Sequence, residues 1–136
     1  MKKIAKLCVL LVICLSPLAS ATVVHADLVG VFTVPPNFYV GSYFSGAGAS
    51  RTGQCYTGIY SPGPSYRAAV NCVMQNNAGI RIDYEVVYGT FGGGGVSATV
   101  HNHTGDTGRI VLFSTHDMWV GSGEPAVEYR MIESLN

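Results

Sequence analysis

The chain has little charge and almost no lysine. Asp, Glu, Lys and Arg together make up 12% of its 136 residues, and its three lysines are Lys2, Lys3 and Lys6. The remaining sequence has no basic cluster of the kind that neutralises phosphate backbones. We therefore expect no nucleic acid as a partner, and anionic membrane surfaces gain nothing from this composition either.

The sequence also lacks an apolar run long enough to span a bilayer comfortably. The run 7–15 is short, follows the lysines, and is broken by Pro17. Small residues follow it, which is the pattern of a signal peptide over residues 1–26 that is cleaved after Ala21 or Ala26. We expect a secreted or periplasmic protein.

Removal of residues 1–26 leaves 27–136, which is 110 residues and enough for a single domain with its own core. This domain holds five arginines and eight acidic residues, so its net charge is −3, and it has no lysine. Cys8 and Cys14 leave with the signal. A lipidated Cys14 would need a small residue before it, where the sequence has Ile13, so we expect no stable membrane anchor.

Only Cys55 and Cys72 then remain in the exported domain. In an oxidising compartment two such cysteines are expected to form a disulfide. Closing a loop of this length stabilises a fold by about 3 kcal/mol in the chain-entropy model. No Cys/His spacing in the sequence indicates a catalytic thiol.

Apolar and polar residues alternate along most of the domain, which is the periodicity of half-buried strands. Gly and Pro divide this pattern into about eight segments. The expected strands are 29–34, 38–44, 54–60, 66–76, 80–89, 96–104, 109–121 and 126–134. This pattern predicts an all-β fold, an antiparallel β-sandwich or a small β-barrel of about eight strands with one disulfide.

The segment 65–79 also fits helical spacing, with Ser65 as an N-cap and Gly79 just past the end. We favour a hairpin through the loop 77–79, because its register sorts apolar from polar residues on both strands. The expected apolar pairs are Met74 with Ile82, Cys72 with Tyr84, Val70 with Val86 and Ala68 with Tyr88. The expected polar pairs are Gln75 with Arg81 and Asn71 with Glu85.

A second hairpin is expected through the turn 105–108, which pairs Thr104 with Arg109 and Val100 with Phe113. Its expected apolar face is Val96, Ala98, Val100, Val111 and Phe113. Two hairpins that each have one apolar face must bury those faces against each other or in a closed barrel.

His101 and His103 stand two apart on an expected strand, so they lie on one side, as a pair of metal ligands must. His116 falls on that side too in the expected register, but about 13 Å away along the strand. A third ligand would have to come from Asp106 or another strand. His101 and His103 are therefore weak metal candidates, and we expect no cofactor.

Hydrolytic chemistry has less support. Ser114, His116 and Asp117 are close in sequence, but alternation puts Asp117 on the opposite face, which breaks a triad within one strand. Asp83 and Glu85 share a face with Arg81, which indicates a solvated strip of charge. We expect no enzyme and no catalytic residues.

The most distinctive pattern is Tyr-x-Gly-x-Tyr, which occurs at 39–43 and again at 56–60. A hairpin between the two would set Tyr43 opposite Tyr56, Gly41 opposite Gly58, and Tyr39 opposite Tyr60. Four tyrosines would then surround a floor of glycine and could accept a sugar ring or a side chain of a partner. Aromatic rings that cover glycines also stabilise sheets without any ligand.

The loop 45–51 is small, polar and rich in glycine, and Arg51 is its only cation. Loops of this kind often make contacts from a rigid β scaffold, so Ser45 and Arg51 are candidate ligand-binding residues. With Ser45-Gly46, the size of the domain and its single disulfide, the chain resembles the exported β-barrel lysozyme inhibitors of bacteria. That family inserts a Ser-Gly loop into the enzyme. It also places a tyrosine shortly after this pair, which is missing here.

The sequence thus predicts a binding domain that recognises a protein or a glycan. Its expected contact residues are Tyr39, Tyr43, Tyr56, Tyr60, Ser45 and Arg51. Inhibition of a secreted enzyme is one form of this function. The alternatives are a metal-dependent or hydrolytic enzyme that uses His101 and His103, and an assembling or membrane-active structural protein.

Overall fold

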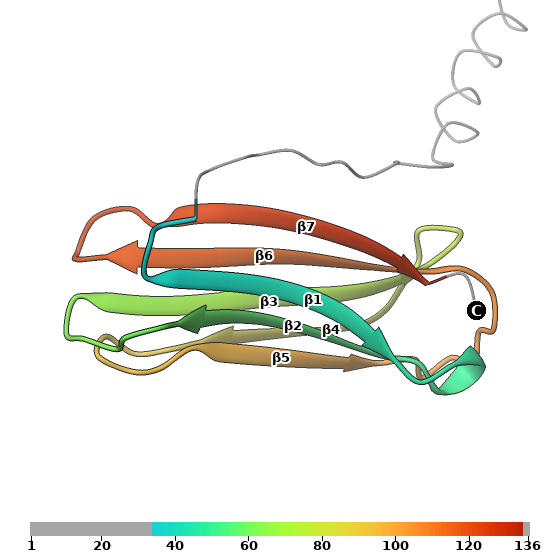
Figure 1. Cartoon of the computed structure of the whole chain (residues 1–136). Helices are drawn as coiled ribbons and strands as arrows, with labels where there is room; N and C mark the ends of the chain where they lie inside the picture. Colours follow the sequence, from blue (N-terminus) through green and yellow to red (C-terminus); the bar gives the residue numbers. More distant parts are fainter. Residues whose placement is uncertain (1–33, 135–136) are drawn as a thin grey trace, which may run out of the picture.

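A computed structural model describes residues 34–134, and within this range it contains seven strands and one short 3-10 helix (Figure 1). The elements are β1 (Phe38–Ser45), η1 (Gly48–Ser50), β2 (Thr52–Ile59), β3 (Tyr66–Asn76), β4 (Arg81–Tyr88), β5 (Val96–His101), β6 (Ile110–Val120) and β7 (Ala126–Ser134). The expected signal peptide and residues 29–33 of the expected first strand lie outside the described residues. No helix within 34–134 is long and apolar enough to cross a membrane.

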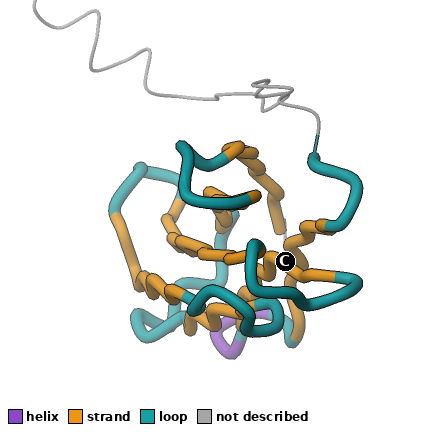
Figure 2. Tube along the Cα trace, turned by 90° about the vertical axis from the view of Figure 1, so that its left-hand side faces the viewer, coloured by secondary structure: helices purple, strands orange, loops and turns teal. Residues whose placement is uncertain are grey.

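The strands form two antiparallel sheets that pack as a β-sandwich. Sheet A has the order β1-β2-β5, and sheet B has the order β4-β3-β6-β7. The strands run side by side along the long axis of the molecule in Figure 1 and are viewed nearly end-on in Figure 2. The predicted all-β class is confirmed.

The core lies between the two sheets, and strand alternation supplies it. The buried side chains of β6 occupy every second position, as the period of two requires, and those of β3 do so apart from Ala69, which is also buried. The predicted disulfide is also confirmed: Cys55 of β2 and Cys72 of β3 bond across the core, with their Cα atoms 5.8 Å apart. This bond joins sheet A to sheet B at their centre.

The contested segment 65–79 is a strand and a turn. β3 covers 66–76, as predicted, and Gly79 has a φ of 76°, a left-handed conformation that Gly adopts without strain. The side chain of Asn76 accepts hydrogen bonds from the backbone N–H groups of Ala78 and Ile80, which fixes the turn. The hairpin interpretation is therefore confirmed.

The expected register of this hairpin is wrong beyond its first pair. Gln75 lies opposite Arg81, as predicted, but a β-bulge follows, and every later pair is shifted by one residue. Val70 thus pairs with Val87, and Asn71 pairs with Val86 instead of Glu85. The shift turns three residues expected in the core outward, and all three are exposed: Tyr84, Val86 and Tyr88.

The bulge has a physical consequence at the edge of sheet A. It brings the Asp83 and Glu85 carboxylates to β5, where they accept hydrogen bonds from the backbone N–H groups of His101 (2.8 Å) and Thr99. The outer edge of β5 is thereby capped by side chains from β4. Edge strands expose unpaired backbone groups, and this arrangement satisfies two of them.

The expected hairpin between β5 and β6 is wrong. β5 pairs with β2 in sheet A, and β6 pairs with β3 and β7 in sheet B, so the segment 102–109 crosses between the sheets. The core face of β6 is therefore the even set, including Ile110 and Leu112, and not the expected Val111 and Phe113. On β5, the expected core residues Ala98 and Val100 are buried, as predicted.

Candidate functional site

The two Tyr-x-Gly-x-Tyr segments lie on β1 and at the end of β2, and they are neighbours in sheet A. The observed register is two residues away from the expected one: Tyr39 lies opposite Gly58, and Gly41 lies opposite Tyr56. A shift of two preserves which side chains share a face. The tyrosines therefore gather on the outer face of sheet A, although none lies directly opposite another.

Each glycine of the pattern is covered by a tyrosine ring from the neighbouring strand. A Cβ atom added at Gly58 would overlap the ring of Tyr39, and one added at Gly41 would overlap the ring of Tyr56. The glycines thus let the rings lie flat against the backbone of the sheet. This contact limits the movement of the rings on the side that faces the sheet.

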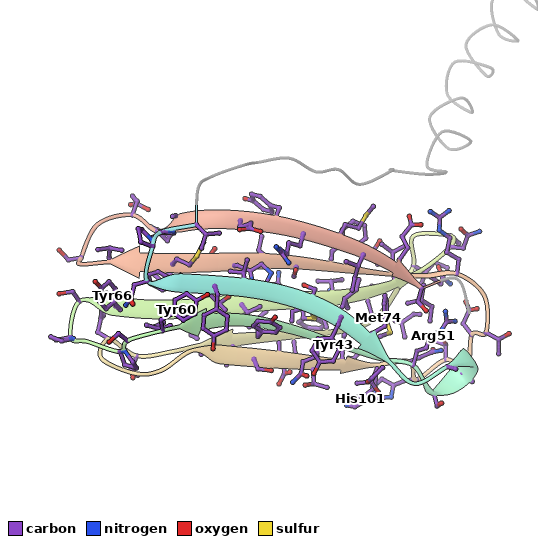
Figure 3. The ribbon with its side chains drawn as sticks, viewed as in Figure 1. Tyr43, Arg51, Tyr60, Tyr66, Met74 and His101 are labelled. Atoms are coloured by element: carbon purple, nitrogen blue, oxygen red, sulfur yellow. A yellow bond between two sulfur atoms is a disulfide. The ribbon has the colours of Figure 1, made fainter. Side chains whose placement is uncertain are left out.

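The four tyrosines form a partly exposed cluster, which we call the tyrosine face. Exposure is 40% for Tyr39, 46% for Tyr43 and 69% for Tyr60, while Tyr56 is half-buried. The ring centre of Tyr39 lies 4.7 Å from that of Tyr60 and 6.0 Å from that of Tyr56. Figure 3 shows Tyr43 and Tyr60 toward opposite ends of the β1–β2 pair.

A hollow of about 410 Å³ runs between these rings and the neighbouring strand β5. Its lining combines three of the tyrosines with uncharged polar side chains and glycine: Tyr39, Tyr43, Gln54, Tyr56, Gly58 and Ser97 contribute to it. Gln54 is held from both sides, since its amide donates to Ser97 Oγ (2.9 Å) and its carbonyl oxygen accepts from the Tyr43 hydroxyl. The polar groups of the hollow are therefore fixed in place.

Ser45 ends β1 on the same sheet and is exposed, as a contact residue must be. Arg51 is different, and the expectation that it offers a cation to a ligand is wrong, because its side chain is completely buried. It donates to the carbonyl oxygens of Gly48 (2.9 Å), Ser134 (3.1 Å), Asp106 (3.2 Å) and Gly108. Arg51 thus holds three chain segments together at the η1 end of the molecule (Figure 3).

The two candidate metal ligands, His101 and His103, are exposed, and their ring centres lie 5.8 Å apart. His103 Nε2 lies 3.2 Å from the Asp83 carboxylate, and His101 Nδ1 lies 3.3 Å from the hydroxyl of Thr52. No group of three or more His, Cys, Asp or Glu side chains within residues 34–134 is arranged to hold a metal ion. His116, expected on the same side, is instead buried in the core.

Sequence reasoning missed a chain of hydrogen bonds that crosses the core between the two sheets three times. Ser42 Oγ lies 2.8 Å from Ser114 Oγ, which lies 2.8 Å from His116 Nε2. His116 Nδ1 lies 3.0 Å from the hydroxyl of Thr57, and that hydroxyl donates to the carbonyl of Ala69 (2.9 Å). Alternation did place Ser114 and His116 on one side and Asp117 on the other, and this part of the prediction is confirmed.

The direction of this chain is determined at its end. Since the Thr57 hydroxyl gives its only proton to a carbonyl, it must accept from His116, and the imidazole carries its proton on Nδ1. Ser114 then donates to Nε2. This is the polarity of a serine–histidine pair in hydrolases, but Ser114 is only 5% exposed and the third member is a neutral threonine. We assign the chain a structural role, because it satisfies buried polar groups of both sheets.

Burial is the main influence on the charge of His116. It lowers the pKa of this imidazole to about 4, and the positive charge of Arg130 acts in the same direction. Arg130 and Glu128 both lie on β7, the strand next to His116, and Nε of Arg130 lies 2.7 Å from Oε1 of Glu128. His116 is therefore neutral in the folded protein near pH 7. On the opposite face of sheet B, burial raises the pKa of Asp117.

Comparison with known proteins finds no family model and no curated sequence that match this chain. Among solved structures, a β-glucuronidase from glycoside hydrolase family 2 aligns over 71% of this chain and 11% of its own length, with 8% identity and a TM-score of 0.39. A protein from Archaeoglobus fulgidus aligns over 72% of this chain and 95% of its own length, with 10% identity and a TM-score of 0.36.

Proposed function

We propose that this protein is an exported binding domain that recognises a neutral glycan through the tyrosine face. The observation that carries the proposal is the clustering of Tyr39, Tyr43, Tyr56 and Tyr60 on one exposed side of sheet A, beside a hollow. Export is supported by the signal-peptide pattern in residues 1–26 and by the Cys55–Cys72 disulfide, a bond typical of oxidising compartments.

The chemistry of the hollow favours a sugar ring over a charged ligand. Its lining residues are uncharged, and they alternate aromatic surface with amide and hydroxyl groups. Tyrosine offers a flat apolar ring that can stack on the C–H face of a sugar and a hydroxyl that can bond to its edge. Gln54 and Ser97 supply further donors and acceptors at the floor.

Preorganisation supports the same function. The rings of Tyr39 and Tyr56 rest on glycine backbone, and the Tyr43 hydroxyl bonds to Gln54. Side chains that are already ordered lose less conformational entropy when a ligand binds. The side chains of the tyrosine face are therefore largely ordered before a ligand binds. The glycines stabilise the sheet and also let the rings take up these positions.

A screen against immobilised glycans followed by calorimetry with the best soluble glycan tests the proposal. We expect Tyr43→Ala and Tyr60→Ala each to weaken binding at least tenfold, since each removes a stacking surface. Tyr129→Ala is the matched control, because Tyr129 is similarly exposed (49%) but lies on sheet B. Binding that survives both substitutions, or that falls equally in the control, would contradict the proposal. Binding of proteins alone would assign the surface to a protein partner.

A further inference from the structure

The outer face of sheet B is a second exposed surface, and it is more apolar than the tyrosine face. Three successive rows cross all four strands, and we call them together the sheet-B face. Their members are Tyr84, Val73, Phe113 and Met131, then Val86, Asn71, Thr115 and Tyr129, then Tyr88, Ala69, Asp117 and Val127. The four most exposed of them are Tyr84, Val86, Tyr88 and Tyr129, and Ala69 is buried. Apolar surface that is continuous over several strands marks an interaction site more often than scattered exposed residues do.

Two details distinguish the centre of this surface. A hollow of about 170 Å³ lies at its centre, lined in part by Val73, Phe113 and Tyr129. Asn71 also lines it, and its Oδ1 atom is buried without a hydrogen-bond donor anywhere in the described part of the chain. Buried polar atoms normally have a partner, so this oxygen requires an explanation.

We propose that the sheet-B face is the interface of a dimer, in which a second copy of this chain packs face to face with the first. The two-fold axis lies in the interface, parallel to the strands and between β3 and β6. In such a contact each residue faces a residue of the second copy that belongs to the same row. That residue lies on the strand at the same distance on the other side of the axis. β4 therefore faces β7 of the second copy, and β3 faces β6.

The charges at the rim favour this orientation. Arg81 and Glu133 belong to one row, on β4 and β7, so the axis sets each Arg81 opposite a Glu133 of the second copy. Oε1 of Glu133 accepts from Arg109, which leaves its second oxygen for Arg81. An axis across the strands would instead set each strand against the same strand of the second copy, so that Arg81 on β4 and Glu133 on β7 would not meet.

The central row gives the same result. Asn71 and Thr115 are partners in it, on β3 and β6, so the proposed axis places Asn71 opposite Thr115 of the second copy. Once the Asn71 amide turns toward the second copy, the threonine hydroxyl can donate to its Oδ1. The apolar row beside it sets Val73 against Phe113 of the second copy, and Tyr84 against Met131.

The size of the surface sets the expected affinity. Four strands about 4.8 Å apart and three to four rows about 7 Å apart give roughly 400 Å² per copy. This is about half of a standard interface, which buries roughly 800 Å² per partner. We therefore expect a weak, reversible dimer.

Sedimentation velocity over a range of concentrations, on protein produced from the full coding sequence, measures this equilibrium. We expect Tyr129→Glu to weaken the dimer at least tenfold, because it places a charge opposite the apolar side chain of Val86 of the second copy. Tyr43→Glu is the matched control on the tyrosine face and should leave the dimer unchanged. Near-UV circular dichroism verifies folding, and Tyr84→Glu, at a site that is 55% exposed, replaces Tyr129→Glu if that variant does not fold.

Charge reversal tests the orientation. We expect Arg81→Glu and Glu133→Arg each to weaken the dimer, and the double variant to recover most of the loss. A protein that stays monomeric at several hundred micromolar, a dimer that resists both tyrosine substitutions, or a double variant no better than the singles would overturn the proposal. Dimerisation only after deletion of residues 27–33 would assign the face to that segment instead. Glycan affinity in calorimetry is a separate measurement, so either proposal can fail without the other.

Discussion

Gly58 is the position at which the tyrosine face depends most directly on the lack of a side chain. Gly58→Ala would push the ring of Tyr39 away from the sheet, because the new Cβ atom would occupy its place. We expect at least a tenfold loss of glycan affinity with a destabilisation of only about 1 kcal/mol, since Tyr39 is partly exposed and can move. Titration calorimetry and urea unfolding measure the two effects. Gly123→Ala, at a site with open space, should change neither.

His116 predicts an acid-sensitive fold. Its pKa is about 4 in the folded protein and near 6.5 when unfolded, so the unfolded chain binds the proton more readily. Stability from this group is complete above about pH 6.5, declines as the pH falls toward 4, and is lost below it. The linked loss is about 3 kcal/mol. Urea unfolding at a series of pH values measures it, and His116→Gln, which cannot titrate, should flatten this part of the curve.

At the scale of elements, the capped edge of β5 shows how the bulge in β4 serves the sandwich. Substituting both Asp83 and Glu85 with Ala removes the acceptors of the Thr99 and His101 N–H groups. We expect these two amides to exchange with solvent at least tenfold faster, and the exposed edge to promote association at high concentration. Hydrogen exchange by NMR measures the first effect. Unchanged exchange would mean that the carboxylates do not cap this edge in solution; Glu124→Ala, in a loop, is the control.

The strands were predictable from the sequence because alternation is local. β3 and β7 begin and end where the pattern predicts, and Gly79 marks the turn between β3 and β4. The pairing partner of each strand was less predictable. The residues 105–108 favour a turn, but they do not determine the sheet in which the next strand pairs. The buried guanidinium of Arg51 holds that segment although Arg51 precedes Asp106 by 55 residues, and no short sequence pattern predicts such a contact.

The prediction that the four tyrosines share one face was correct although the expected register was wrong, and the reason is related. The true pairing of β1 and β2 differs from the expected one by two residues, which keeps all four tyrosines on one side. In β4 the error was one residue, and it moved Tyr84, Val86 and Tyr88 from the core to the surface. Because of the single bulged residue Ile82, the exposed side chains of the sheet-B face could not be predicted from the sequence.

At the scale of the whole molecule, the two proposed surfaces lie on opposite sides of the sandwich. The tyrosine face covers sheet A, and the proposed dimer joins two copies through sheet B. The order of layers in the dimer is then A-B-B-A, and with about 10 Å between packed sheets the two tyrosine faces lie roughly 30 Å apart and point away from each other. Such a dimer cannot place both faces on one flat surface, but it can bridge two surfaces.

This geometry predicts cross-linking instead of tighter attachment. At concentrations above the dimer dissociation constant, the protein should agglutinate beads that carry its glycan. Tyr129→Glu should still bind the beads but no longer agglutinate them, because each monomer has one tyrosine face. Tyr43→Glu should dimerise and fail at both. Light scattering measures agglutination, and depletion of the protein from solution measures binding. Agglutination by Tyr129→Glu at the level of the natural protein would contradict the layer order, since bridging requires two outward faces held by one interface.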